Sequence, residues 1–268
     1  MVHNLPPNPD TELEEFAEFS GELADCARAI AMRYFREPMT VEHKPDASPV
    51  TRADREIETA LREQIHARYP EHAVSGEEFG YASDTALCTW VIDPIDGTKS
   101  FVTGRPTFGT LIALLAEGRP VLGVVEIPAL GERWMGLHGA ATTFNGDVCR
   151  TSGRQQLREA TLLATTIDMF SDKERAGFDA LTTRVRFRSF GADCYAYGLI
   201  ASGHIDLVVE ADMAPHDYLA MAPVIEGAGG VVTDWDGTPL TMNSGTQVMA
   251  AATPSLHQQA LEILRPYR

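Results

Sequence analysis

Asp93 and Asp96 are two acidic residues separated by only two positions, and they directly follow a short apolar run at residues 90–92. Such a run is typical of the end of a buried strand. Pro94 lies between the two acids and restricts Asp93 to extended or turn conformations. We therefore expect the strand to end in a tight turn that presents both carboxylates. Two hard oxygen ligands in one turn are suited to a divalent cation such as Mg²⁺.

Gly97 and Thr98 follow the second acid and complete the string D-P-I-D-G-T at residues 93–98. Gly97 lets the backbone approach a ligand closely, and Thr98 adds a hydroxyl group beside it. The pair therefore indicates a phosphate group next to the cation. The alternative is an ordinary surface turn, since Asp, Pro and Gly all favour turns. The complete string directly after an apolar strand favours the ligand site.

Three other segments, read together with residues 93–98, match one known family in the same order. They are residues 48–54 (SPVTRAD), 75–78 (SGEE) and 215–230 (PHDYLAMAPVIEGAGG). The chain resembles the inositol-monophosphatase-like, metal-dependent phosphatases, from about residue 10 to the C-terminal helix. The resemblance implies an α+β fold, a layered αβαβα sandwich of the inositol monophosphatase and fructose-1,6-bisphosphatase type.

The resemblance also implies a metal site built from Glu77, Asp93, Asp96 and Asp217, with the backbone carbonyl of Ile95 as a further ligand. Four carboxylates cannot share a pocket unless cations compensate their charges. Oxygen ligands favour Mg²⁺ over zinc, which prefers His and Cys. We expect two or three Mg²⁺ ions, which Mn²⁺ could replace.

The implied mechanism is hydrolysis by an activated water, without a covalent phosphoenzyme. Glu77 and the Thr98 hydroxyl would orient the water, and Asp54 would support Thr98 and accept a proton. Backbone N–H groups of Gly97 and Thr98, at a helix start, would hold phosphate oxygens. From the residues alone, Asp54 could instead be an acid in the first turn of a helix, and Asp217 could instead be a helix cap.

Three nearby residues have less defined roles. Lys44 is similar to a loop lysine that approaches the metal site in relatives, although loop lysines are usually solvated. Glu78 is expected to be solvated or to lie behind the metal ligands. His216 departs from the family pattern, in which an aromatic residue is expected, and it leaves the pocket wall at that point undefined.

Residues 99–106, 188–198 and 214–230 look more like the histidinol-phosphate phosphatase branch than the inositol branch. The resemblance implies hydrolysis of L-histidinol phosphate to L-histidinol, in histidine biosynthesis. That substrate carries an ammonium and an imidazole, so acids should line its pocket, and Asp193 and Glu210 are available. The expected substrate contacts are Gly97, Thr98, Asp193, Glu210 and Asp217. Glu210 could instead be a solvated strand end, and Asp193 a helix-start cap.

Three other functions remain open. An inositol-1-monophosphatase would use the same chemistry with a neutral polyol pocket. The acidic composition disfavours a nucleotide-bisphosphate phosphatase, and the complete set of acids with Thr98 disfavours a catalytically inactive metal-binding or regulatory relative. Relatives are commonly homodimers, and the resemblance implies the same assembly here.

The composition disfavours several classes of protein function and location. The 268 residues suffice for two closely packed lobes with a large core. A net charge of −16 disfavours a nucleic-acid binder or a protein of anionic membrane surfaces. The four cysteines form no C-x-x-C pair and are expected to be reduced thiols of a cytoplasmic protein. The N-terminal residues contain no signal-peptide pattern, and no apolar stretch is long enough to cross a membrane.

The elements that must position these residues fall into two patterns. We expect lobes at residues 1–150 and 151–268, with the active site between them. The first lobe begins with amphipathic helices at residues 11–36 and from residue 51 onward, which should cover one face of an antiparallel-rich sheet. In the second lobe strands alternate with helices, as in an α/β unit. A further helix is expected to begin at His216.

Overall fold

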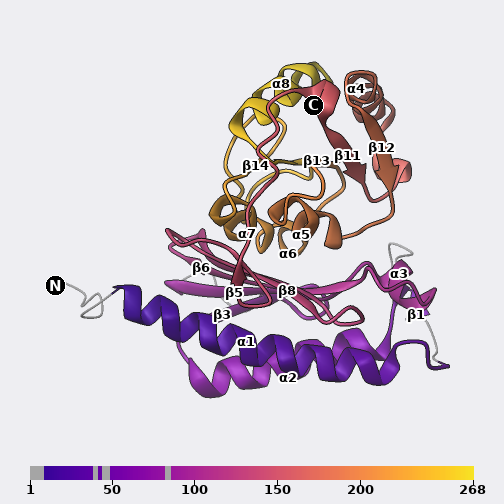
Figure 1. The fold of residues 1–268 in the computed structure, drawn as a ribbon. Coiled ribbons are helices and arrows are strands. Elements are labelled where there is room, and N and C mark those ends of the chain that lie inside the picture. The colour runs from indigo at the N-terminus through magenta and orange to yellow at the C-terminus, as the bar shows by residue number, and fades with distance from the viewer. Residues whose placement is uncertain (1–8, 39–41, 44–48, 82–85) are drawn as a thin grey trace.

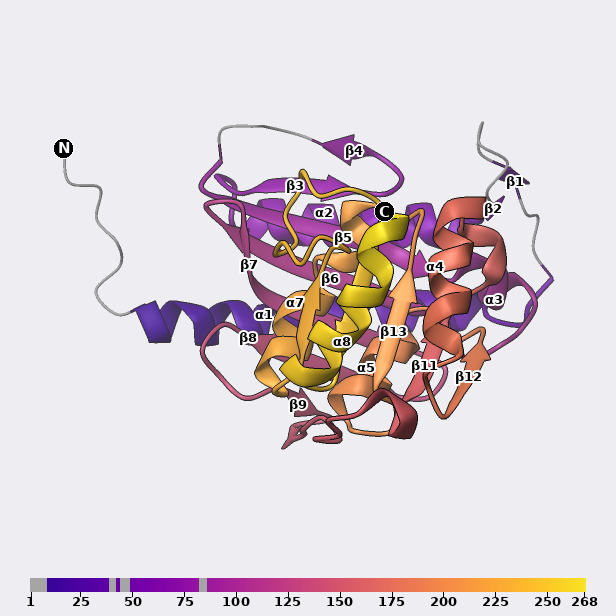
Figure 2. The same cartoon turned by 90° about the horizontal axis from the view of Figure 1, so that it is seen from above.

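The structure is a computed structural model that describes residues 9–38, 42–43, 49–81 and 86–268. Helices and two large sheets alternate in layers (Figure 1). Two long helices, α1 (Pro9–Tyr34) and α2 (Arg52–Arg68), cover one face of an eight-stranded sheet. Short helices separate this sheet from a five-stranded one, and α4 (Asp172–Thr182) and α8 (Pro254–Leu264) cover the outer side (Figure 2). The layered αβαβα sandwich is confirmed.

The eight-stranded sheet is antiparallel apart from the parallel pairing of β3 with β5. In spatial order its strands are β10 (Asp147–Val148), β9 (Thr143–Phe144), β8 (Glu132–Leu137), β7 (Arg119–Ile127), β6 (Gly109–Ala116), β5 (Cys88–Asp96), β3 (Ala73–Gly76) and β4 (Gly80–Tyr81). One face packs on α1 and α2 in a core that contains Leu23, Ile57 and Trp90, as the amphipathic helices predict. β1 (Glu42–His43) and β2 (Pro49–Val50) form a separate antiparallel pair.

β5 carries the D-P-I-D string and continues further than expected. Asp93 and Asp96 both pair with residues of β6, and the register shifts between the two acids. The expected tight turn after residue 92 is therefore wrong: the chain forms a bulge inside the strand, and α3 (Thr98–Val102) follows it. Pro94 has no N–H to donate to β6, so the ladder is interrupted where the bulge forms.

The five-stranded sheet is mixed. In spatial order its strands are β12 (Phe187–Phe190), β11 (Thr161–Ala164), β13 (Leu207–Glu210), β15 (Val248–Ala251) and β14 (Val231–Thr233). Between the two large sheets lie α5 (Tyr195–Ala201), α6 (Pro215–Tyr218) and α7 (Met221–Gly227) (Figure 1). The short 3₁₀ helices are η1 (Leu157–Glu159), η2 (Ile167–Met169) and η3 (Arg265–Tyr267). Strands therefore alternate with helices here, as expected.

The segment after residue 214 contains two short helices rather than the one helix predicted from His216 onward. α6 ends at Tyr218, and α7 begins at Met221. Pro223 has no N–H and cannot bond to the carbonyl of residue 219, so the helical hydrogen-bond ladder is interrupted there. The break places α6 against β5 and β6, and α7 against β7 and β8.

Some expectations are not decided by the fold. The lobe boundary at residues 150 and 151 stays a prediction, as does the cytoplasmic location. In the part of the chain that the structure describes, every helix is too short or too polar to span a membrane. Lys44 lies outside the described residues.

Candidate active site

The predicted carboxylates converge where β3 and β5 end. These strands run parallel, so Glu77, directly after β3, lies beside the end of β5 with Asp93 and Asp96. The N–H of Glu77 donates to the carbonyl of Ile92 at 3.2 Å. α6 brings Asp217 to the same place from the second half of the chain. Ligand atoms of Asp93, Asp96 and Asp217 all lie within 4.8 Å of one another.

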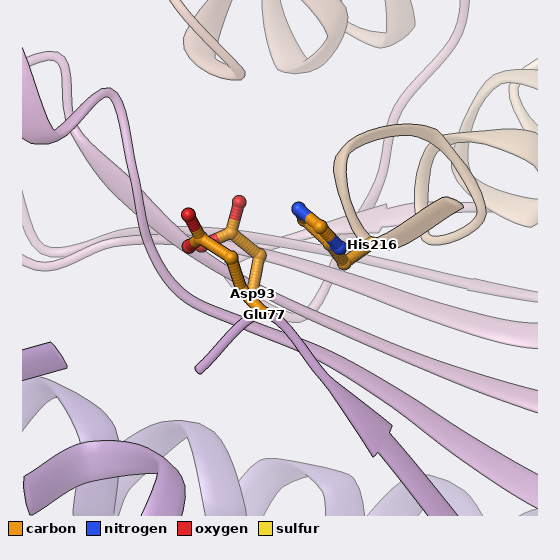
Figure 3. Close-up of side chains that lie close together, drawn as sticks. All are labelled: Glu77, Asp93 and His216. Atoms are coloured by element: carbon orange, nitrogen blue, oxygen red, sulfur yellow. The ribbon is translucent and has the colours of Figure 1, made fainter. Parts of the chain in front are cut away.

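Two further groups share members with this one. Glu77, Asp93 and His216 form one group (Figure 3), and Asp54, Glu77 and Glu78 form the other, each within the same 4.8 Å limit. We call the acidic residues of these three groups the acidic cluster: Asp54, Glu77, Glu78, Asp93, Asp96 and Asp217. The structure brings the predicted residues together, and their individual roles stay predictions. Glu78 was expected to be solvated or to lie behind the metal ligands, and His216 only at the pocket wall, whereas both offer possible ligand atoms here.

Burial makes the acidic cluster electrostatically unfavourable without cations. Asp93 is 2% exposed, and burial raises its pKa well above the usual range. The charge of Glu77 is the next largest cause. Burial also raises the pKa values of Asp96 and Asp217. Asp93 Oδ1 has no hydrogen-bond partner among the described residues. A buried, unpartnered carboxylate oxygen among other acids fits a ligand of a divalent cation, and hard oxygens suit Mg²⁺.

Backbone N–H groups orient two of these acids. The N–H of Cys194 donates to Asp96 Oδ2, and the N–H of Ala214 donates to Asp217 Oδ2, both at 2.7 Å. Asp217 therefore does cap the start of α6, as one interpretation of the sequence proposed. Its second oxygen, Oδ1, faces His216 Nε2 at 3.4 Å. Because a carboxylate has two oxygens, capping and membership of the cluster are compatible.

Asp54 forms the N-terminal capping box of α2. Its Oδ2 accepts from the N–H of Thr51 at 2.9 Å and from the Thr51 hydroxyl at 2.5 Å. Thr98 Oγ1 donates to the carbonyl of Ile95 at 3.1 Å, and its expected support by Asp54 stays a prediction. Asp54 Oδ1 is buried and has no hydrogen-bond partner among the residues that the structure describes. One oxygen thus caps the helix, and a ligand atom of Asp54 also lies within 4.8 Å of those of Glu77 and Glu78.

Replacing Asp54 with Asn should stabilise the metal-free protein relative to wild type, increasingly so as the pH rises from about 4 to 6. Burial raises the Asp54 pKa from 3.8 to about 6. The folded wild type therefore binds the proton more tightly than the unfolded chain, and this stability is lost as the pH rises through that window. A pKa change of this size corresponds to about 3 kcal/mol, whereas Asn does not titrate and can accept both bonds from Thr51.

Chemical denaturation in the presence of a chelator, at both ends of this pH range, measures the difference in the free energy of unfolding. A difference in the free energy of unfolding between wild type and variant that stays constant across this pH range would contradict the prediction. Addition of Mg²⁺ should reduce the difference, because a bound cation offsets the cost of ionising the buried acids.

Glu58 positions the segment that carries Glu77, and it was not found from the sequence. It is fully buried on α2 and accepts hydrogen bonds from the N–H groups of Glu78 at 2.7 Å and Phe79 at 3.2 Å. Gly76 leaves room for this carboxylate, because a Cβ there would lie 2.1 Å from Glu58 Oε1. The available signal was an acid within the buried face of an amphipathic helix.

A cavity beside the acidic cluster is lined by all the predicted substrate contacts, namely Gly97, Thr98, Asp193, Glu210 and Asp217. Glu210, at the end of β13, is 2% exposed, so its interpretation as a solvated strand end is wrong. Its Oε1 accepts from the N–H of Thr165 at 2.9 Å and from the Thr165 hydroxyl at 2.6 Å. Its Oε2 accepts from the Tyr197 hydroxyl at 2.8 Å. Three donors therefore hold this carboxylate in place.

Asp193 is held in a different way from the one expected. Its Oδ2 accepts from the hydroxyls of Ser100 at 2.6 Å and Thr107 at 3.0 Å, which lie on or after α3. The helix-cap interpretation is therefore wrong. Gly97 permits this approach: its φ is +76°, and a Cβ there would lie 2.8 Å from Asp193 Cγ. The phosphate-binding turn predicted at Gly97 is thus packed directly against Asp193, which lines the cavity.

Comparisons with known proteins agree with this geometry. The model of the inositol monophosphatase family matches residues 12–268. The bifunctional phosphatase IMPL2, chloroplastic, of Arabidopsis thaliana is 44% identical over 264 residues, covering 95% of this chain and 76% of the relative. A histidinol-phosphatase from Streptomyces coelicolor is 39% identical over 254 residues, covering 90% of this chain and 94% of that protein. The solved structure of an inositol monophosphatase from Zymomonas mobilis superposes with a TM-score of 0.87 at 41% identity, covering 94% of this chain and 98% of the other.

The layered fold and the buried acidic cluster, together with these matches, define a metal-dependent phosphomonoesterase, that is, a phosphoric monoester hydrolase. The chain belongs to the inositol monophosphatase family.

Proposed function

We propose that this chain hydrolyses L-histidinol phosphate to L-histidinol in histidine biosynthesis. The observation that carries the proposal is the pair of buried acids, Asp193 and Glu210, which line the same cavity as the acidic cluster. Charge-assisted hydrogen bonds to such acids favour a cationic ligand, and histidinol phosphate carries an ammonium and an imidazole beside its phosphate ester. A relative named histidinol-phosphatase, at 39% identity, supports the assignment.

Mg²⁺ is the proposed cofactor, with two or three ions per site. Glu77, Asp93, Asp96 and Asp217 would hold these ions together with the carbonyl of Ile95. When bound, the ions would activate the attacking water and neutralise the charge that develops on the leaving oxygen. The oxygen donors fit such ions, and the buried carboxylates need their charge.

The chain's own residues would orient the reactants. Thr98 Oγ1 gives its hydrogen to the carbonyl of Ile95, which leaves oxygen lone pairs to accept from water. Glu77 would accept from the same water. The first N–H groups of α3, after Gly97, have no intrahelical partners and would bind phosphate oxygens. Asp54 Oδ1 would accept a proton, and no covalent phosphoenzyme is required.

Replacing Glu210 with Gln should lower kcat/KM for histidinol phosphate by about tenfold or more, because a hydrogen bond to a charged group contributes roughly 1.5–3 kcal/mol. Gln preserves the shape and can still bond to Thr165 and Tyr197. Hydrolysis of a small ester without a cationic group, such as p-nitrophenyl phosphate, should barely change and serves as the control. Equal losses for both substrates would mean that Glu210 supports the site without contacting the cationic group.

An inositol-1-monophosphatase is the second candidate, favoured by the likeness to the Zymomonas mobilis structure at 41% identity. Phosphate release from histidinol phosphate, inositol 1-phosphate, fructose 1,6-bisphosphate and adenosine bisphosphate discriminates these activities. Preference for inositol 1-phosphate would overturn our assignment, and no Mg²⁺-dependent release from any ester would indicate an inactive relative. The homodimer stays a prediction, and a monomer in sedimentation at micromolar concentration would contradict it.

A further inference from the structure

His216 brings a nitrogen donor to one side of the acidic cluster. One ring nitrogen of His216 and one carboxylate oxygen each from Glu77 and Asp93 lie within 4.8 Å of one another. Figure 3 shows the imidazole on α6 pointing toward the two carboxylates, which come from the ends of β3 and β5. One oxygen of Asp93, Oδ1, is buried and has no hydrogen-bond partner within the described residues.

The ligand atoms of Glu77, Asp93 and His216 differ in kind from those of Asp93, Asp96 and Asp217. Asp93, Asp96 and Asp217 offer oxygens alone, which suits Mg²⁺. An imidazole nitrogen is a softer ligand, and nitrogen-containing sites bind Mn²⁺ and later divalent metals more tightly than all-oxygen sites do. At metal–ligand distances of about 2.0–2.2 Å, two ligands on opposite sides of one ion lie about 4.0–4.4 Å apart. The three atoms lie within 4.8 Å of one another, so a small movement of the side chains lets one ion contact all of them.

We infer that His216 is a direct ligand of the metal ion held between Glu77 and Asp93, so that this position prefers a transition metal such as Mn²⁺ to Mg²⁺. Asp217 Oδ1 lies 3.4 Å from His216 Nε2, beyond the usual N–H···O distance of about 2.7–3.2 Å, so this contact leaves the imidazole able to bind a cation. Its other oxygen is bound to the N–H of Ala214. The inference rests on the metal-dependent phosphatase function proposed above and adds a ligand to it.

The test uses the full chain with Mn²⁺ as the probe. Pulsed electron paramagnetic resonance of the Mn²⁺-loaded wild type should show modulation from a coordinated ¹⁴N nucleus. Labelling all histidines with ¹⁵N should change that modulation, which identifies the donor as a histidine nitrogen without any substitution. Absence of nitrogen coupling in the wild type would overturn the inference, whatever the catalytic activity.

His216→Gln should abolish the nitrogen coupling and reduce the preference for Mn²⁺ over Mg²⁺, measured by calorimetric titration of both ions, by about tenfold or more. His204→Gln is the matched control, because His204 is exposed in the turn before β13 and should leave both readouts unchanged. Persistence of the coupling in His216→Gln would refute the assignment. If the protein released phosphate with Mg²⁺ but showed no nitrogen coupling, His216 would not be a ligand and the proposed function would stand. If it showed nitrogen coupling but released phosphate from no ester, His216 would be a ligand and the proposed function would be wrong.

Discussion

Replacing Asp93 with Asn should reduce Mg²⁺-dependent phosphate release by about a thousandfold or more, because a lost metal position removes several kcal/mol of transition-state stabilisation. Asp93 belongs to both groups of candidate ligands, with Asp96 and Asp217 on one side and with Glu77 on the other. Its substitution therefore weakens two cation positions at once. No other member of the acidic cluster except Glu77 is shared in this way, so Asp93→Asn should have the largest effect of the single substitutions considered.

The fold should survive this change. Asn has the shape of Asp, and removal of a buried negative charge lessens repulsion within the acidic cluster. The metal-free variant should therefore be at least as stable as metal-free wild type near neutral pH. Mg²⁺ should raise the melting temperature of wild type by binding the folded state, and it should have little effect on the variant.

Thermal unfolding with and without Mg²⁺, beside a phosphate-release assay, measures both effects. Asp147→Asn is the matched control, because this acid is exposed on β10. Asp217→Asn should lose activity in the same way as Asp93→Asn, while its amide oxygen continues to accept from the N–H of Ala214. Near-normal activity of Asp93→Asn at saturating Mg²⁺ would contradict the assignment of the metal site.

Thr98→Ala should lower kcat by roughly a hundredfold and change KM little, since positioning of a reacting group by a side chain contributes 10²–10⁴-fold. The hydroxyl group is the only part removed, and it lies at the start of α3 within the cavity next to the acidic cluster. The carboxylates are untouched, so Mn²⁺ and Mg²⁺ affinities should stay near wild type.

Thr98→Ser supplies the control, because it retains the hydroxyl and its bond to the carbonyl of Ile95. Its kcat should return to within a few-fold of wild type. If Thr98→Ala kept the wild-type kcat, the hydroxyl would serve only to tie the start of α3 to the end of β5.

The sequence by itself determined the local features of this protein. Thr51 and Asp54 specified the start of α2, because a capping box depends on residues three positions apart. The amphipathic pattern specified that α1 and α2 cover a sheet, and the D-P-I-D string located a carboxylate pair at the end of a strand. The grouping of Glu77, Asp93, Asp96 and Asp217 was inferred from resemblance, since neither spacing nor periodicity relates β3 and β5 to a helix that begins only at Pro215.

The tertiary structure alone decided which atoms face one another. Thr98 bonds to the carbonyl of Ile95, and Asp193 bonds to two hydroxyls instead of capping α5, because side-chain directions depend on the bulge in β5 and on the packing of distant segments. Glu58 carries no motif and acquires its role from the turn folded over α2, and His216 acquires its position from the packing of α6 against β5 and β6. The contacts of Asp193, Glu58 and His216 join residues far apart in the chain, so no local pattern encodes them.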